Sequence, residues 1–219
     1  MDVAAAFNLA RLVPVVVLDD AATAGGLADA LVAGGLPVVE VTLRTDAALG
    51  SIRAMAARGD IIVGAGTVLT IAQVDDVVAA GASFVVSPGL SRPVVERCRE
   101  SGVFVLPGAV TATEIQAALE LGVTTVKFFP ASTCGGAPAI AALAAPFGEV
   151  GFVPTGGVGP HNLAEYLAVP AVIAVGGSWM VPRDRVHAGD FTGITQLTAA
   201  AVAFANTETS AATSARSPR

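Results

Sequence analysis

The sequence predicts an α/β fold, and within that class a single-domain (β/α)8 TIM barrel. Three observations favour this fold: short runs rich in Val and Ile recur about every 20 to 26 residues, Ala-rich stretches compatible with helices lie between them, and the 219-residue length suits eight such units. Nearly continuous Val and Ile runs are typical of parallel strands covered on both faces. A doubly wound parallel sheet is the alternative, because counting units does not prove that the sheet closes.

The eight expected strands are the apolar runs of the chain, in order residues 13–18, 38–43, 61–68, 84–88, 103–106, 125–129, 151–155 and 172–175. The expected helices between and after them are residues 21–33, 46–58, 71–80, 92–100, 113–121 and 187–205. Glycines stand just before several strands, where they would end the preceding helices: Gly34, Gly35, Gly81, Gly102 and Gly122. We expect residues 1–206 to form the barrel and residues 207–219, rich in Ser, Thr and Ala, to be a disordered tail.

Composition excludes several classes of function. The net charge of -6 argues against a nucleic-acid-binding protein, and no apolar run approaches the roughly 20 residues of a membrane span. The first residues lack the basic segment of a signal peptide, so we expect a cytoplasmic protein. Cys98 and Cys134 lack metal-site spacing and are expected to be free thiols, and His161 and His187 have no partner with metal-ligand spacing. We therefore expect neither a metal nor a cofactor.

Charged residues interrupt two of the expected strands. Of the 12 basic residues, 11 are Arg, and the single lysine, Lys127, lies inside a strand. Because strand side chains alternate between faces, Glu40, Thr42 and Arg44 should share a face opposite an apolar one, and Lys127 likewise lies on the less apolar face of its strand. In a barrel these charges would point inward or lie at the mouth, near the carboxyl ends of the strands, where active sites of such barrels lie.

Two interpretations of these inward charges stay open. Buried charges are costly unless they pair or have a function, so Glu40 could form a purely structural ion pair with Lys127 or Arg44. The alternative is chemistry, with Lys127 as a nucleophile. The position of the charges near strand ends favours the second interpretation.

Glycines follow the last two expected strands, in residues 154–159 and 175–179. Glycines at strand ends let backbone N–H groups approach an anion closely, and the loops after strands seven and eight are the recurrent phosphate site of barrels. Ordinary turn glycines are the alternative. Residues 64–67, at the end of the third strand, would make room for substrate, and no nucleotide-binding glycine motif occurs.

The chain resembles the KDPG/KHG aldolases, which act on 2-dehydro-3-deoxy-6-phosphogluconate and 4-hydroxy-2-oxoglutarate. The resemblance spans about residues 13–182 and rests on motifs in order: Glu40-Val41-Thr42-Leu43-Arg44, Gly64-Ala65-Gly66-Thr67, Ser87-Pro88-Gly89, Leu106-Pro107-Gly108, Val126-Lys127-Phe128-Phe129-Pro130-Ala131, Pro154-Thr155-Gly156-Gly157 and Gly176-Gly177-Ser178-Trp179. Residues 132–136, which follow the lysine motif, vary in the family and leave fine substrate choice open.

This resemblance implies a class I aldolase that needs no cofactor or metal and is commonly a homotrimer. It implies that Lys127 forms a Schiff base with the keto carbon and that Glu40 is the general acid and base. The remaining implied substrate-binding residues are Arg44 and Thr67 for the carboxylate, Pro88 and Phe129 for the pocket wall, Thr155 for stereochemical preference, and Gly156, Gly157, Gly177 and Ser178 for the distal phosphate. The implied products are pyruvate and glyceraldehyde 3-phosphate.

Other activities are compatible with the same residues. The second hypothesis is an aldolase for another 2-keto-3-deoxy sugar phosphate, such as the galactonate epimer, or one acting chiefly on 4-hydroxy-2-oxoglutarate to give pyruvate and glyoxylate. A third, from a different class, is a phosphate-binding barrel or a barrel isomerase without covalent chemistry. Only the aldolases would form a covalent adduct on Lys127.

Overall fold

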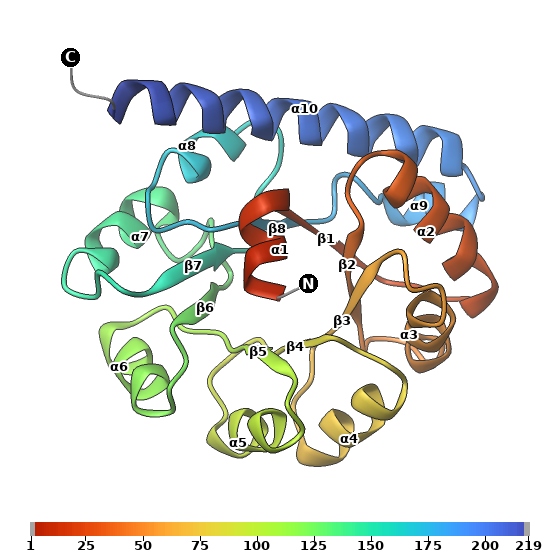
Figure 1. Cartoon of the computed structure of the whole chain (residues 1–219), viewed down its shortest axis with the longest axis horizontal. Coiled ribbons are helices and arrows are strands. Elements are labelled where there is room, and N and C mark those ends of the chain that lie inside the picture. Colours follow the sequence, from red (N-terminus) through yellow and green to blue (C-terminus); the bar gives the residue numbers. More distant parts are fainter. Residues whose placement is uncertain (1–2, 217–219) are drawn as a thin grey trace.

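The computed structural model describes residues 3–216, with side chains described to residue 208. Eight strands alternate with helices along the chain (Figure 1). The strands are β1 (Leu12–Val16), β2 (Val38–Thr42), β3 (Ile62–Gly66), β4 (Phe84–Val86), β5 (Phe104–Leu106), β6 (Thr125–Phe128), β7 (Gly151–Pro154) and β8 (Val175–Gly177). The helices are α1 (Val3–Ala10), α2 (Ala24–Ala33) after a short 3-10 turn η1 (Ala21–Thr23), α3 (Ala48–Ala56), α4 (Ile71–Ala79), α5 (Arg92–Glu100), α6 (Ala112–Glu120), α7 (Gly136–Ala144), α8 (Leu163–Leu167), α9 (Arg183–His187) and α10 (Phe191–Arg216).

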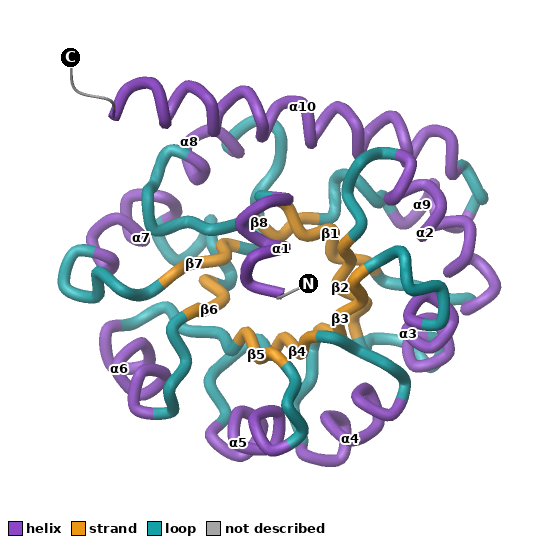
Figure 2. Tube along the Cα trace, viewed as in Figure 1, coloured by secondary structure: helices purple, strands orange, loops and turns teal. Residues whose placement is uncertain are grey.

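All paired strands run parallel, which confirms the predicted α/β class. Six of them form one sheet in the order β5-β4-β3-β2-β1-β8, and β6 and β7 form a second sheet. Isolated bridges link the two sheets, between Gly108 and Lys127 on one side and between Thr155 and Gly176 on the other. Figure 2 shows the strands around a common centre, with α1 across that centre and the other helices outside the strands.

The core explains why the strands are so apolar. All five residues of β2 are buried, and Val39 and Val41 have no exposed surface. The strand is thus covered on both faces, as expected for parallel strands between a barrel interior and outer helices. Helices α4 and α6 each begin with a capping box, formed by Thr70 with Gln73 and by Thr111 with Glu114.

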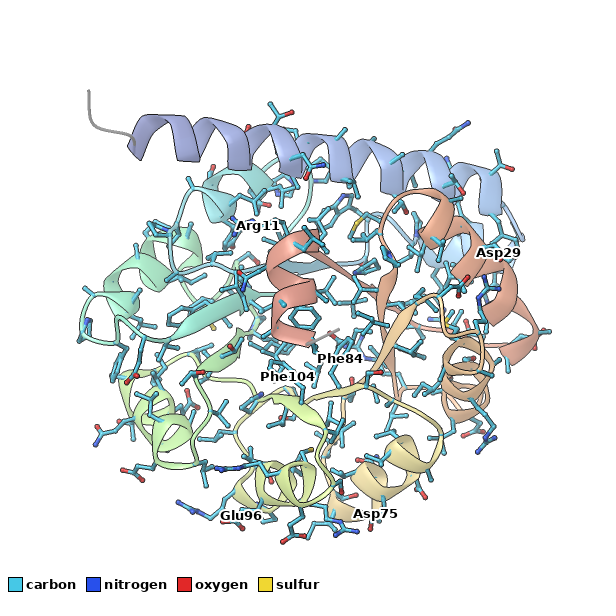
Figure 3. The ribbon with its side chains drawn as sticks, in the orientation of Figure 1. Arg11, Asp29, Asp75, Phe84, Glu96 and Phe104 are labelled. Atoms are coloured by element: carbon cyan, nitrogen blue, oxygen red, sulfur yellow. The ribbon has the colours of Figure 1, made fainter. Side chains whose placement is uncertain are left out.

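Helix α1 covers the amino-terminal end of the strands, where Figure 1 shows it across the centre of the molecule. Its Phe7 packs edge-on against Phe84 of β4 and Phe104 of β5, with ring centroids 5.1 and 6.0 Å apart. Figure 3 shows both of these strand residues beside the helix. The opposite, carboxyl-terminal end of the strands is left for the functional site.

The structure differs from the sequence prediction at two places near the carboxyl terminus. The eighth strand is Val175–Gly177 instead of residues 172–175, because the regular pairing with β1 begins at Val175. Val172 makes only an isolated bridge to Phe152. Helix α10 continues to Arg216 through most of the segment predicted to be a tail, since neither Gly nor Pro occurs between Gly193, in its first turn, and Pro218; residues 217–219 lie outside the described residues.

Candidate active site

A buried ion pair joins two strands that are not neighbours in the sheet. The ammonium nitrogen Nζ of Lys127 on β6 lies 3.3 Å from Oε1 of Glu40 on β2. The two side chains are only 7% and 3% exposed. Strand alternation thus correctly predicts that both side chains point to the interior, and of the two partners considered for Glu40 the structure pairs it with Lys127.

Glycine makes room for this carboxylate. Gly66, at the end of β3, pairs with Thr42 of β2, and a methyl group at Gly66 would lie 2.1 Å from Oε1 of Glu40. No non-bonded contact between a carbon and an oxygen is that short. Any larger residue at position 66 would therefore force Oε1 of Glu40, the atom that contacts Lys127, to shift.

A cavity of about 400 Å³ opens at the carboxyl-terminal ends of the strands. Seven of the residues predicted from the sequence line it: Arg44, Phe129, Thr155, Gly156, Gly157, Gly177 and Ser178. The Lys127–Glu40 pair lies beside it, because the Lys127 ammonium is 5.1 Å from the centroid of the Phe129 ring. The arrangement places a lysine side chain and a carboxylate next to a space large enough for a small organic anion.

Besides Lys127 and Glu40, which lie beside the cavity, two predicted substrate-binding residues are not among those that line it. Thr67 follows β3 directly and adopts a left-handed backbone with φ of 61°, which is unusual for a β-branched residue. Pro88 is exposed after β4, and its carbonyl would meet a methyl group placed on Gly108. Arg44 does line the cavity, although β2 ends at Thr42, so the strand alternation used to predict its direction covers only Glu40 and Thr42.

The glycines at the ends of β7 and β8 pack closely against neighbouring side chains. A methyl group on Gly176 would lie 2.3 Å from Oγ1 of Thr155, and one on Gly157, whose φ is 73°, would lie 1.9 Å from Oγ of Ser132. Close packing against Thr155 and Ser132 therefore requires glycine at both positions. The anion cradle predicted for residues 154–159 stays a prediction, and Gly156 and Gly157 line the cavity where it would lie.

Sequence reasoning missed one polar residue of the cavity. Arg183, the first residue of α9, lines it beside Gly177 and Ser178. Its guanidinium donates to Asp19 from Nε at 2.8 Å and from Nη2 at 2.6 Å. The available signal was a cation placed five residues after Ser178, in the loop that follows the eighth strand.

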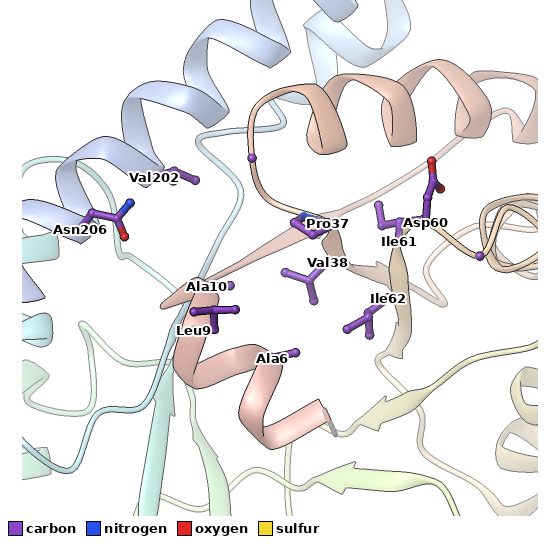
Figure 4. A pocket seen from close by; sticks show the side chains of 12 residues that line it. Ala6, Leu9, Ala10, Pro37, Val38, Asp60, Ile61, Ile62, Val202 and Asn206 are labelled. Carbon is purple, nitrogen blue, oxygen red and sulfur yellow. The ribbon is translucent and has the colours of Figure 1, made fainter. Parts of the chain in front are cut away.

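Another cavity, of about 490 Å³, lies near the amino-terminal end of the strands, between α1, α10 and the starts of β2 and β3 (Figure 4). Aliphatic side chains such as Leu9, Val38 and Ile62 line it, with Asp60 at its edge. The described residues that line it include no pair of groups suited to acid, base or nucleophilic chemistry. The first cavity is therefore the candidate active site.

The remaining reactive groups do not form a second site within the described residues. Cys98 and Cys134 are free thiols, as predicted, and burial raises the pKa of Cys98 to about 11, which keeps it protonated. No three His, Cys, Asp or Glu side chains cluster as metal ligands in the part of the chain that the structure describes.

None of the described helices is long and apolar enough to cross a membrane.

Known proteins resemble this chain over nearly its whole length. Residues 3–197 match the family described as KDPG and KHG aldolase. A protein from Treponema pallidum named 2-dehydro-3-deoxy-phosphogluconate aldolase is 50% identical over 88% of this chain and 92% of its own length, and the KHG/KDPG aldolase of Escherichia coli K12 is 46% identical over 87% and 90%. The crystal structure of KDPG aldolase from Legionella pneumophila, which holds pyruvate as a covalent carbinolamine intermediate, superposes with a TM-score of 0.88, at 40% identity over 91% of this chain and 98% of that one. The chain described above belongs to the KDPG and KHG aldolase family.

Proposed function

We propose that this protein is a class I aldolase that cleaves 2-dehydro-3-deoxy-6-phosphogluconate to pyruvate and glyceraldehyde 3-phosphate. The observation that carries the proposal is the buried Lys127, 3.3 Å from Glu40 and beside the cavity at the strand ends. Lysine forms Schiff bases with carbonyl substrates when its amine is unprotonated. The covalent pyruvate intermediate of the Legionella pneumophila relative supports the same chemistry here.

The reaction follows from the positions of these two groups. The Lys127 amine attacks the C2 keto carbon, and the resulting carbinolamine loses water to give a cationic iminium. Glu40 accepts the proton of the C4 hydroxyl, directly or through a water, while the C3–C4 bond breaks and its electrons move into the iminium. The aldehyde leaves and an enamine remains on Lys127.

The second half of the reaction returns the enzyme to its starting state. The enamine takes a proton at C3, which Glu40 is placed to supply, and becomes the iminium of pyruvate. Water hydrolyses this iminium, so pyruvate is released and the Lys127 amine is restored. The carboxylate thus acts first as a base and then as an acid.

The residues around the pair are proposed to bind the two ends of the substrate. Arg44 and Thr67 hold the carboxylate of the keto acid, since a guanidinium can bind a carboxylate with two parallel hydrogen bonds. Phe129 and Pro88 shape the pocket wall, and Thr155 contacts the carbon that carries the new alcohol. The backbone of Gly156, Gly157 and Gly177 and the hydroxyl of Ser178 receive the distal phosphate.

A second substrate has specific support. The Escherichia coli relative is named for both KHG and KDPG, and its identity to this chain is similar to that of the relatives named for KDPG alone. We therefore also propose activity on 4-hydroxy-2-oxoglutarate, which shares the keto-acid end and differs at the far end. Pyruvate release from the gluconate substrate, its galactonate epimer and 4-hydroxy-2-oxoglutarate tests both proposals. We expect the gluconate substrate to give the highest kcat/KM, and preference for another member of this panel would overturn that assignment.

The architecture and assembly are proposed on the same basis. The isolated bridges between the two sheets support a closed eight-stranded (β/α)8 barrel. The family resemblance supports a cytoplasmic homotrimer, and two apolar side chains close in sequence, Leu69 and Ile71, are 54% and 47% exposed, as interface residues of a separated subunit would be. The molar mass in solution, measured by light scattering, tests the trimer.

A further inference from the structure

The charged residues among those that line the active-site cavity are two arginines, Arg44 and Arg183. Arg44 follows β2 and Arg183 begins α9, after β8, while β1 lies between β2 and β8 in the sheet. No carboxylate occurs among the described residues that line this cavity. Because the whole chain carries a net charge of -6, attraction of an anion depends on such local cations.

Arg183 is held in a fixed orientation although much of it is exposed. Its Nε and Nη2 donate to the two oxygens of Asp19, at 2.8 and 2.6 Å, in a bidentate pair. His187, one turn further along α9, places Nε2 2.8 Å from Oδ2 of the same carboxylate. The hydrogen bonds of Arg183 and then of His187 lower the pKa of Asp19 to about 2, so Asp19 stays ionised and the pair persists at neutral pH.

This pairing leaves part of the guanidinium for a ligand. Nη1 and its two N–H groups take no part in the bidentate pair, and Arg183 lines the cavity next to Gly177 and Ser178. A planar guanidinium fixed along one edge can present its other edge to a phosphate without losing further side-chain entropy. An exposed ion pair contributes little to stability, so stability alone is a weak reason for the arrangement.

We infer that Arg183 is a further specificity-determining residue, which binds the phosphate group at the far end of the substrate. Asp19 is the positioning residue that orients the guanidinium of Arg183. The inference rests on the proposed function, because it concerns the far end of the same substrate. Arg44 then serves the carboxylate end and Arg183 the phosphate end. The two cations match the two anionic groups of a keto-acid phosphate.

The first experiment separates the phosphate end from the chemistry. Steady-state cleavage of 2-dehydro-3-deoxy-6-phosphogluconate by Arg183→Ala should show a KM about three- to tenfold higher than wild type, with kcat little changed, since one charge-assisted contact is lost in both the ground and transition states. The pyruvate concentration that half-saturates borohydride trapping should stay the same, because pyruvate has no distal group. Arg185→Ala is the matched control: it removes a cation from the same helix, paired at 2.6 Å with Asp190, outside the cavity lining.

A double-mutant cycle tests the role of Asp19. Asp19→Asn should raise KM for the phosphorylated substrate in the wild-type background, because Arg183 loses its fixed orientation. In the Arg183→Ala background the same change should leave KM unchanged or lower it, because only the repulsion between Asp19 and the phosphate is then removed. An equal rise in both backgrounds would show that Asp19 does not act through Arg183.

Each result has a defined meaning. An unchanged KM in Arg183→Ala, or an equal loss of affinity for pyruvate, overturns the inference and leaves the proposed function standing. A wild-type enzyme that traps pyruvate but does not cleave the phosphorylated substrate overturns the proposed substrate and this inference with it. A rise in KM restricted to the phosphorylated substrate, and absent from Arg185→Ala, supports it.

Discussion

The ammonium of Lys127 on β6 and the carboxylate of Glu40 on β2 meet at 3.3 Å across the interior of the molecule, 87 residues apart in the sequence. A buried pair of this kind repays its desolvation only with excellent geometry, and replacement by apolar side chains is often neutral or stabilising. Stability is therefore a poor explanation of the pair. Its position beside a cavity that fits a small anion favours chemistry.

The first prediction concerns Glu40 as acid and base. Glu40→Gln keeps the size of the side chain but removes its ability to exchange a proton, so kcat should fall about 10² to 10⁴-fold. Steady-state kinetics measure the fall. Glu96→Gln, at a side chain 53% exposed on α5, is the matched control and should keep full activity. Near-normal kcat in Glu40→Gln would make Glu40 a structural partner of Lys127.

A second prediction uses the space that Gly66 leaves for Glu40. Gly66→Ala places a methyl group 2.1 Å from Oε1 in the present geometry, so this atom, which contacts Lys127, must shift. Misplacement of a catalytic group by about 1 Å can cost about 10²-fold, and we expect kcat to fall by that order. Gly25→Ala on α2, where an added methyl group meets nothing within 4 Å, should be silent. Equal kinetics in the two variants would show that the position of Glu40 does not limit the rate.

The third prediction concerns the carboxylate end of the substrate. Arg44→Lys keeps the positive charge but loses the planar fork, so KM for the keto acid should rise about tenfold while kcat changes little. Both constants come from the same cleavage assay. A large fall in kcat with unchanged KM would place Arg44 in the chemical step instead.

The fourth prediction concerns metals. In a Schiff-base aldolase the iminium accepts the electrons that a divalent ion would accept in a Lewis-acid aldolase, so excess EDTA should leave the cleavage rate unchanged. Inhibition by EDTA that zinc or magnesium reverses would contradict the mechanism. EDTA removed by dialysis before assay serves as the control for direct effects of the chelator on the assay.

Local sequence patterns predict much of this fold and of the candidate site. The features that they do not predict depend on contacts between residues far apart in the sequence. Apolar runs at regular spacing locate β1 to β7, and alternation within strands places Glu40 and Lys127 inward. The eighth strand is misplaced because Val-Gly-Gly offers no apolar alternation, whereas the preceding residues 172–175 form an apolar run that makes only an isolated bridge. Arg183 escapes sequence reasoning because nothing local distinguishes it from the other arginines, and its fixed orientation depends on Asp19, 164 residues away.

Reductive trapping of pyruvate tests the central claim most directly. Lys127 is the single lysine of the chain, so besides the α-amino group it is the only aliphatic amine that can form a Schiff base. The protein is incubated with pyruvate and sodium borohydride, and intact-mass measurement and peptide mapping locate the adduct. Lys127→Arg, which keeps the charge but is not deprotonated in practice, is treated in parallel, with circular dichroism to confirm that it is folded. We predict one stable adduct on Lys127 in the wild type, and neither adduct nor cleavage activity in Lys127→Arg. Two results would contradict the Schiff-base mechanism: cleavage of the substrate by folded Lys127→Arg, or an active wild-type enzyme that yields no adduct on Lys127.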